Sequence, residues 1–361
     1  MMESRVRADT AIIGGGLAGT ALAWAMVRRG VEVVVIDPEE PCTSSRVAAG
    51  LVTPIAGQRF VVSWDYEDAW PLARAHYADV EQASGQTLVR DRPMVRLIEN
   101  EREAGFWANK RETLPRHLWR DLLPEDLPEG IDAPLGGMVM PGAARLDVPG
   151  YLSASRRLLG ETGLCRYLSA RVPVDGGLSR CHEGWRLDPP GLQARRVVFC
   201  QGFEAADNPW FQGLIFNPSK GEILDIEVDE LRATRTIHRG VWLVAEDTGK
   251  YRAGSTYTWH DTTTTPTEKG REEVVARLKR FLRLPFTVTG QRAGVRPNIH
   301  GFLPVIGSHP VEPGLAMFNG LGSKGSLLAP KMAAMLAGHL LSGDAIPRDI
   351  DVRRRMAGER P

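Results

Sequence analysis

Residues 9–37 read DTAIIGGGLAGTALAWAMVRRGVEVVVID, and this stretch decides the fold class. Its pattern predicts a short apolar strand at 9–13, a glycine-rich turn at 14–19 and a helix at 17–29. The run VEVVVI at 31–36 is β-branched and almost entirely apolar, which is typical of a strand buried on both faces. Strand, glycine turn, helix and strand in this order predict a βαβ unit in a doubly wound α/β domain.

The glycines of this turn fit a nucleotide-binding pattern. Gly14, Gly16 and Gly19 match GxGxxG, and Asp37 comes 23 residues after Gly14, at the end of the second strand. The first glycine permits the tight turn, the second lets a pyrophosphate approach the backbone, and the third lets helix and strand pack closely. We therefore expect a dinucleotide at the helix N-terminus, with Asp37 accepting hydrogen bonds from ribose hydroxyls. A glycine-rich turn that binds no ligand is the alternative.

Length and composition exclude several classes of protein. The chain has 361 residues, enough for two domains, and its net charge is +1. That balance excludes a strongly basic nucleic-acid binder, so no nucleic acid is expected as a partner. The four cysteines show no CxxC spacing, which argues against a disulfide scaffold or a zinc site and favours the cytoplasm; the histidines show no metal-binding spacing either. No signal peptide or membrane span is expected.

A second glycine-rich turn lies near the other end of the chain. Residues 315–328 read LAMFNGLGSKGSLL, which predicts a strand, a turn and the start of a helix at about 326–341. The N-terminus of this helix also favours an anion. Two such turns from distant segments suit a long, extended cofactor such as FAD.

The remaining pattern predicts two domains interleaved along the chain. Alternating strands are predicted at 220–228, 241–245 and 251–256, an amphipathic helix at 267–284, and a Gly/Pro-rich segment at 290–307. We assign 1–64, 149–203 and 291–361 to an FAD-binding domain, and 65–148 and 204–290 to a substrate-binding domain with an antiparallel sheet.

The chain resembles the superfamily of FAD-dependent D-amino-acid oxidases and glycine oxidases, which also contains sarcosine oxidases and D-amino-acid dehydrogenases. Six segments carry the resemblance: GGGLAG with Asp37, SSRVAAGLVTP at 44–54, RRVVFCQGF at 195–203, YRAGSTY at 251–257, AGVRPNIHGFLPVIG at 293–307 and FNGLGSKGSLLAP at 318–330. The resemblance implies a mixed α/β fold, in which a glutathione-reductase-like FAD-binding Rossmann domain is interleaved with an antiparallel-sheet substrate domain.

The resemblance also implies which residues bind FAD. Ser44, Ser45, Ala49 and Gly50 would lie along the phosphates and the ring. Further cofactor-binding residues assigned in this way are Leu17, Ala18, Leu51, Val172, Gly202, Gly322, Ser323, Lys324, Gly325 and Ser326.

Two cations are expected to act in catalysis. Arg296 matches the arginine that grips the substrate carboxylate in glycine-oxidase-like members, and a planar guanidinium pairs well with a carboxylate. An interdomain salt bridge is the alternative. Lys324 matches a position often Lys or Arg in the family, near flavin N1 and the C2 carbonyl, where a cation stabilises the reduced, anionic ring. The alternative is a solvated lysine.

Two further residues are assigned to the active site by position in the family pattern. Trp242 falls where glycine oxidases carry an active-site tyrosine, with core packing as the alternative. Arg252 falls where sarcosine oxidases carry a lysine that promotes the reaction with oxygen, although an arginine does not titrate as a lysine does. His300 stands where the family often has an aspartate, and we assign it no role.

The function implied is oxidation of the C–N bond of a small amino acid or secondary amine. Hydride would pass to flavin N5, and the resulting imine would be hydrolysed; oxygen or a quinone would be the electron acceptor. The alternatives are a flavin-dependent dehydrogenase or oxidase of a 2-hydroxy acid, removal of a carboxymethyl group from a modified tRNA base, which the charge balance disfavours, and a non-catalytic flavin-binding module.

Overall fold

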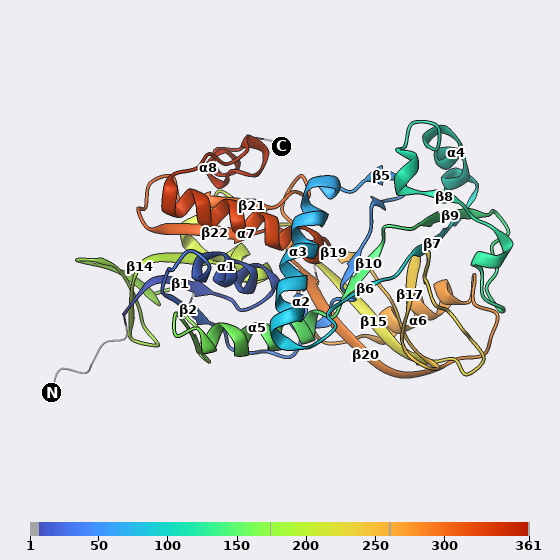
Figure 1. Cartoon of the computed structure of the whole chain (residues 1–361), viewed down its shortest axis with the longest axis horizontal. Coiled ribbons are helices and arrows are strands. Elements are labelled where there is room, and N and C mark those ends of the chain that lie inside the picture. The colour runs from blue at the N-terminus through green and yellow to red at the C-terminus, as the bar shows by residue number, and fades with distance from the viewer. Residues whose placement is uncertain (1–6, 174, 260, 360–361) are drawn as a thin grey trace.

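The computed structural model describes residues 7–173, 175–259 and 261–359, and Figure 1 shows its two large sheets at opposite ends of the longest axis. One sheet has eight strands and the other has nine. The mixed α/β fold class expected from the sequence is confirmed. No helix among the described residues is long and apolar enough to cross a membrane.

The first sheet brings together strands from distant parts of the chain. Its parallel core runs in the order β11, β2, β1, β14 and β22, and β12, β13 and β21 add antiparallel edges. The bounds are β1 Arg7–Ile13, β2 Val33–Ile36, β11 Cys165–Leu168, β12 Leu178–Cys181, β13 Gly184–Leu187, β14 Leu192–Phe199, β21 Val305–Ser308 and β22 Leu315–Asn319. All four residues of β2 are buried, as a strand covered on both faces requires.

Helices cover the first sheet. Helix α1 packs against α7 and α5, and α3 packs against α7 and α5 in turn (Figure 1). The bounds are α1 Leu17–Val27, α3 Tyr66–Ser84, α5 Val148–Glu161 and α7 Gly325–Ser342. Both predicted glycine turns therefore lead into helices of one layer, α1 and α7, which lie side by side.

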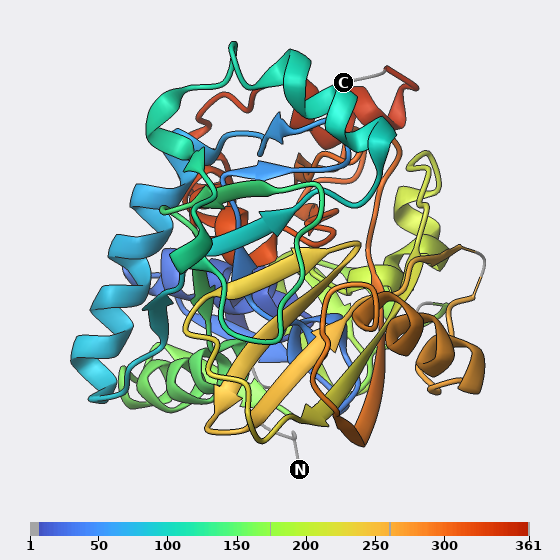
Figure 2. The same ribbon diagram turned by 90° about the vertical axis from the view of Figure 1, so that its right-hand side faces the viewer.

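The second sheet is mostly antiparallel and forms the other end of the molecule (Figure 2). Its strands run in the order β19, β15, β18, β17, β16, β7, β9 and β8, and β20 pairs with the other edge of β15. The bounds are β7 Met94–Leu97, β8 Arg120–Asp121, β9 Gly137–Met140, β15 Ser219–Glu227, β16 Thr236–Arg239, β17 Val241–Asp247, β18 Lys250–Gly254, β19 Thr258–Trp259 and β20 Thr287–Arg296.

The two faces of the second sheet serve different purposes. Because successive side chains of a strand point to opposite faces, alternate residues separate into two sets. One set, with Leu224, Ile237, Leu243 and Ala253, forms an apolar core with α6 (Glu268–Leu278). The other set, with Ile223, His238, Trp242 and Gly254, lines a cavity.

Smaller elements complete the fold. They are α2 (Ser44–Val47), α4 (Glu101–Lys110), α8 (Val352–Met356), β3 (Leu51–Val52), β4 (Ile55–Ala56), β5 (Val61–Val62), β6 (Val89–Asp91) and β10 (Ala144–Leu146).

Two features of the local structure differ from the sequence pattern. The Gly/Pro-rich segment at 290–307 begins within β20, which continues to Arg296 and pairs with β15 with one irregularity. Pairing with a long neighbouring strand outweighs the poor strand propensity of Gly290 and Gly294. The helix expected at 267–284 ends at Leu278. The domain boundaries stay a prediction, and β20 runs across the one placed at 290/291.

Candidate active site

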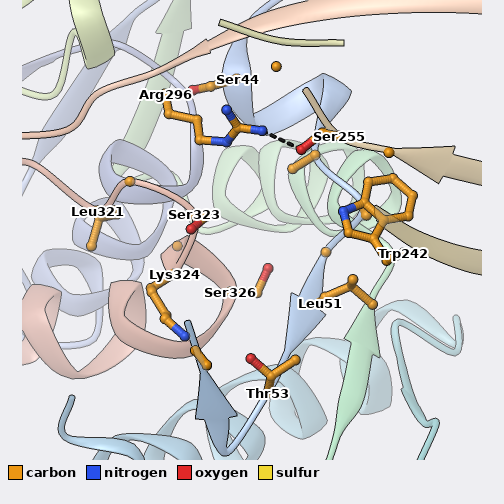
Figure 3. A pocket seen from close by; sticks show the side chains of 18 of the residues that line it. Ser44, Leu51, Thr53, Trp242, Ser255, Arg296, Leu321, Ser323, Lys324 and Ser326 are labelled. Carbon is orange, nitrogen blue, oxygen red and sulfur yellow. Dashed lines mark hydrogen bonds between the residues drawn. The ribbon is translucent and has the colours of Figure 1, made fainter. Parts of the chain in front are cut away.

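A cavity of about 750 Å³ is lined by loops of the first sheet and the inner face of the second. Figure 3 shows Arg296 and Lys324 on one side of this cavity and Trp242 on the other. The cavity collects most of the residues assigned from the sequence: Gly16, Leu17, Ala18, Ser44, Ser45, Ala49, Gly50, Leu51, Gly202, Trp242, Arg296, Gly322, Ser323, Lys324, Gly325 and Ser326.

The glycine turn before α1 has the shape of a phosphate cradle. At Gly14, where φ is +105°, an added Cβ would lie 2.3 Å from the Cys200 carbonyl oxygen, and at Gly19 it would lie 1.9 Å from the Gly14 oxygen. Helix α1 begins with no side-chain cap and no acidic residue in its first turn. Its first N–H groups therefore face the cavity end of the turn without competition from a carboxylate, which suits an anionic ligand.

Asp37 and Ser45 hold this turn in place. The Asp37 Oδ2 atom accepts a hydrogen bond from the Gly15 N–H at 2.5 Å, and its Oδ1 atom accepts one from the Glu39 N–H at 2.7 Å. The Ser45 Oγ atom accepts one from the Leu17 N–H at 3.1 Å. Asp37 does not line the cavity, and its role toward a ribose stays a prediction.

Arg296 is a partly buried cation at the end of β20. Its Nη2 atom donates to the Ser255 hydroxyl and, at 3.2 Å, to the Thr256 carbonyl. Its Nη1 atom is buried without a hydrogen-bond partner. Burial lowers the pKa of Arg296, and no carboxylate among the described residues pairs with it. The alternative of an interdomain salt bridge is therefore not observed for Arg296 in the described part of the chain.

Two neighbours fix the Arg296 guanidinium. Its carbon lies 4.1 Å from the centroid of the Tyr257 ring. On Gly221 an added Cβ would lie 2.1 Å from Nη2, so the guanidinium rests against a backbone that has no side chain. Neither Tyr257 nor Gly221 is assigned a role from the sequence alone. Gly221 and Arg296 are 75 positions apart, and no local pattern connects them.

Lys324 is a second cation facing the cavity. It is the residue before α7, and its Nζ atom donates to the Ser63 hydroxyl at 2.6 Å. That hydroxyl donates in turn to the Thr53 carbonyl at 2.6 Å. Burial lowers the pKa of Lys324 to about 8, and no carboxylate pairs with it in the described structure. A desolvated ammonium without a counter-ion suits an anionic ligand better than it suits a solvated surface.

Five assigned residues do not line the cavity: Gly14, Gly19 and Asp37 belong to the glycine turn and its support, whereas Arg252 and Val172 lie elsewhere. Arg252 lies farther along β18, where its Nε atom is 2.8 Å from Glu246 and 3.5 Å from Asp225. Val172 is buried in the core on the other side of the first sheet, with Phe199. Gly14 and Gly19 allow the close backbone contacts within the turn and do not line the cavity. No group of His, Cys, Asp or Glu within the described residues is arranged to hold a metal ion.

Comparison with known proteins gives the family. The family model for FAD dependent oxidoreductases matches residues 9–338. The chain belongs to this family. FAD is therefore its cofactor, and three features fit such a dianionic, extended group: the glycine cradle, the first turn of α1 without an acidic residue, and the Lys324 cation without a carboxylate partner among the described residues.

The oxidoreductase is similar in sequence to proteins with two kinds of name. It is 28% identical to a tRNA 5-methylaminomethyl-2-thiouridine biosynthesis bifunctional protein of Caulobacter vibrioides, over 94% of this chain and 56% of that protein. It is 24% identical to a glycine oxidase of Geobacillus kaustophilus, over 92% of each chain. The oxidoreductase thus spans about half the length of the tRNA-modification proteins that it matches.

Solved structures show the same fold. Glycine oxidase from Geobacillus kaustophilus superimposes with a TM-score of 0.80 at 22% identity, over 94% of this chain and 96% of that one. Iminodiacetate oxidase from Chelativorans sp. BNC1 superimposes with a TM-score of 0.73 at 22% identity, over 94% and 97%.

Proposed function

We propose that this oxidoreductase oxidises the C–N bond of an amino acid or secondary amine that carries a carboxylate. The observation that carries the proposal is Arg296, a partly buried guanidinium that lines the cavity and pairs with no carboxylate among the described residues. A largely desolvated cation without a counter-ion is costly, and a bound carboxylate would supply one.

The residues around the cavity have distinct proposed roles. Arg296 binds the carboxylate and thereby orients the amine, while Trp242 forms the facing wall. Lys324 holds positive charge beside the cofactor ring, where the Ser63 hydroxyl keeps its Nζ atom in position. FAD, when bound, would accept a hydride, which carries both electrons of the C–N oxidation. No carboxylate or histidine is needed to explain the site, since positioning supplies much of the rate enhancement in such a reaction.

Anaerobic mixing of the yellow holoenzyme with a panel of amines tests the proposal. The panel contains glycine, sarcosine, proline, D-amino acids, 2-hydroxy acids and amines that lack a carboxylate, and flavin bleaching is the signal. A charge-assisted hydrogen bond contributes about 1.5–3 kcal/mol, so Arg296→Leu should cost roughly tenfold to a few hundredfold in kcat/KM for a carboxylate substrate.

Two controls separate a carboxylate-binding role of Arg296 from a structural one. An amine without a carboxylate should lose much less in Arg296→Leu, and Arg296→Lys should recover part of the loss because it keeps the charge. Equal losses for both kinds of amine would show that Arg296 is structural. Bleaching by 2-hydroxy acids alone would show that the substrate is a 2-hydroxy acid and not an amine.

A second candidate is removal of a carboxymethyl group from a modified tRNA base. The 28% identity to the tRNA-modification protein of Caulobacter vibrioides supports it. The net charge of +1 offers little attraction to the tRNA backbone. We therefore rank this candidate function below the oxidation of a small amine. Bleaching by carboxymethylated tRNA, and not by free amines, would reverse this order.

A further inference from the structure

The cavity wall of the second sheet continues beyond Trp242 to a polar region. In the strand register, Trp242 of β17 lies opposite His238 of β16, and His238 lies beside Arg96 of β7. All three side chains line the cavity. Neighbouring strands are about 4.8 Å apart, so the backbone of Arg96 lies about 10 Å from that of Trp242.

Arg96 is held rigidly and has hydrogen-bonding capacity to spare. Its side chain is 5% exposed, and its Nη2 atom donates to Glu103. Its guanidinium carbon lies 4.1 Å from the centroid of the Phe60 ring. The other Glu103 oxygen accepts from the Glu99 N–H at 2.7 Å, so the acid is already satisfied. The Nε atom of Arg96 is buried without a partner.

His238 adds a neutral polar group to the same wall. Burial, with a smaller contribution from Arg96, lowers the pKa of His238 to about 3. The imidazole is therefore uncharged near neutral pH and offers one donor and one acceptor. The nearby cation Arg277 is paired with Glu273 at 2.9 Å. The region thus presents directed hydrogen-bond donors and little net charge.

We propose that Arg96 and His238 form a distal subsite that binds a carboxylate or carboxamide oxygen at the far end of an elongated amine substrate. The inference rests on the proposed function, because it places the reacting end of the substrate at Arg296. The Arg296 guanidinium lies against Gly221 on β15, four strand intervals from β7, which corresponds to about 19 Å across the sheet. An arginine side chain covers only part of that span, so a molecule of glycine size is far too short to reach both groups.

A structural role alone does not account for the position of Arg96 on the cavity wall. A buried ion pair contributes little compared with well-packed apolar residues, and an unsatisfied buried N–H group destabilises the fold. A ligand oxygen in the cavity would give the Arg96 guanidinium, which lines that cavity, an acceptor in addition to Glu103.

Binding of matched ligands to the holoenzyme tests the subsite. The probes are carboxymethyl ethers, in which oxygen replaces the amine nitrogen so that no C–N bond can be oxidised. Their chains increase in length and end in methyl, carboxamide or carboxylate. Dissociation constants come from the perturbation of the flavin absorbance. At one chain length, the carboxamide or carboxylate ligand should bind at least tenfold more tightly than the methyl ligand.

Two variants test whether Arg96 and His238 form the distal subsite. His238→Leu leaves the ion pair intact, and Arg96→Met combined with Glu103→Met removes both charges together, so no buried charge is left unpaired. In each, the preference for a polar end over methyl should fall by at least threefold. A carboxylate that binds better than a carboxamide would identify an anionic end group.

The outcomes distinguish the two proposals. If ethers ending in methyl bind and no chain length shows a preference for a polar end, the distal subsite is overturned while the carboxylate site at Arg296 stands. A polar preference that persists undiminished in both variants overturns the assignment to Arg96 and His238. If no carboxymethyl ether binds and no amine bleaches the flavin, both proposals fail.

Discussion

The guanidinium of Arg296 stacks on the ring of Tyr257, with 4.1 Å between the guanidinium carbon and the ring centroid. Tyr257 follows β18, whereas Arg296 ends β20, so the contact joins two segments on either side of β15. The stack and the two bonds from Nη2 to Ser255 and Thr256 fix the guanidinium, and neither Nε nor Nη1 has a hydrogen-bond partner among the described residues. The orientation of the proposed carboxylate site therefore depends on Tyr257.

Replacing Tyr257 should weaken carboxylate binding without removing the arginine. A cation–π contact contributes about 0.5–2 kcal/mol, so Tyr257→Leu should raise KM for carboxylate substrates roughly twofold to thirtyfold. Tyr257→Phe keeps the ring and should stay near the wild-type value. A Phe variant as impaired as the Leu variant would show that the hydroxyl, not the stack, matters.

A methyl group on Gly221 should displace the guanidinium. The added Cβ of Gly221→Ala would lie 2.1 Å from the Arg296 Nη2 atom, so the side chain must move. We expect a loss in kcat/KM for carboxylate substrates comparable to that of Arg296→Leu, with FAD still bound. Gly105→Ala, where nothing lies within 4 Å, is the matched control. Wild-type kinetics for Gly221→Ala would mean that the guanidinium does not rest there.

The affinity for FAD should fall as the pH rises above about 8. Burial lowers the pKa of Lys324 to about 8 in the cofactor-free protein, and an anionic cofactor beside the ammonium would raise it again. Above pH 8, binding must therefore include uptake of a proton, which weakens it by up to tenfold per pH unit. Fluorescence titration of the apoprotein with FAD from pH 7 to 9.5 measures this slope.

Lys324→Met separates this effect from general alkaline destabilisation. The variant should show no such slope, because it has no proton to take up. It should also bind sulfite more weakly than wild type, because the flavin–sulfite adduct is anionic. A variant that keeps both the slope and the wild-type sulfite affinity would show that Lys324 does not face the flavin.

Asp37 should support FAD binding in two ways. Its Oδ2 atom fixes the Gly15 N–H, and the sequence motif predicts a further bond to a ribose hydroxyl. Asp37→Ala removes both and should leave more apoprotein after gel filtration. Asp37→Asn keeps one acceptor oxygen and should retain more FAD than the Ala variant. Full retention of FAD by Asp37→Ala would show that neither contact is needed.

The parts of the fold that local patterns specify were predictable. The βαβ unit at 9–37 carries its own strand, turn and helix signals, and the turn at 320–325 does so too; the structure confirms the elements in both places. Sequence also indicated that Arg296 and Lys324 belong to one site, although only through resemblance to a family.

What depends on pairing between distant segments was not predictable. Strand β20 contains two glycines, and only its partner β15 makes it a strand. Arg252 was assigned by position in the family pattern, but Glu246 and Asp225 pair with it outside the cavity. Gly221 matters because of a side chain that lies 75 residues later.

The alternating faces of the second sheet have a consequence for how such an enzyme changes its preferences. Leu243 and Ile237 belong to the core with α6, while Trp242 and His238 meet the cavity. A substitution at every second position therefore alters what is bound and leaves stability largely intact. Specificity and folding can evolve almost independently at such positions, and a laboratory library restricted to His238 and Trp242 would explore new substrates while most of its members still fold.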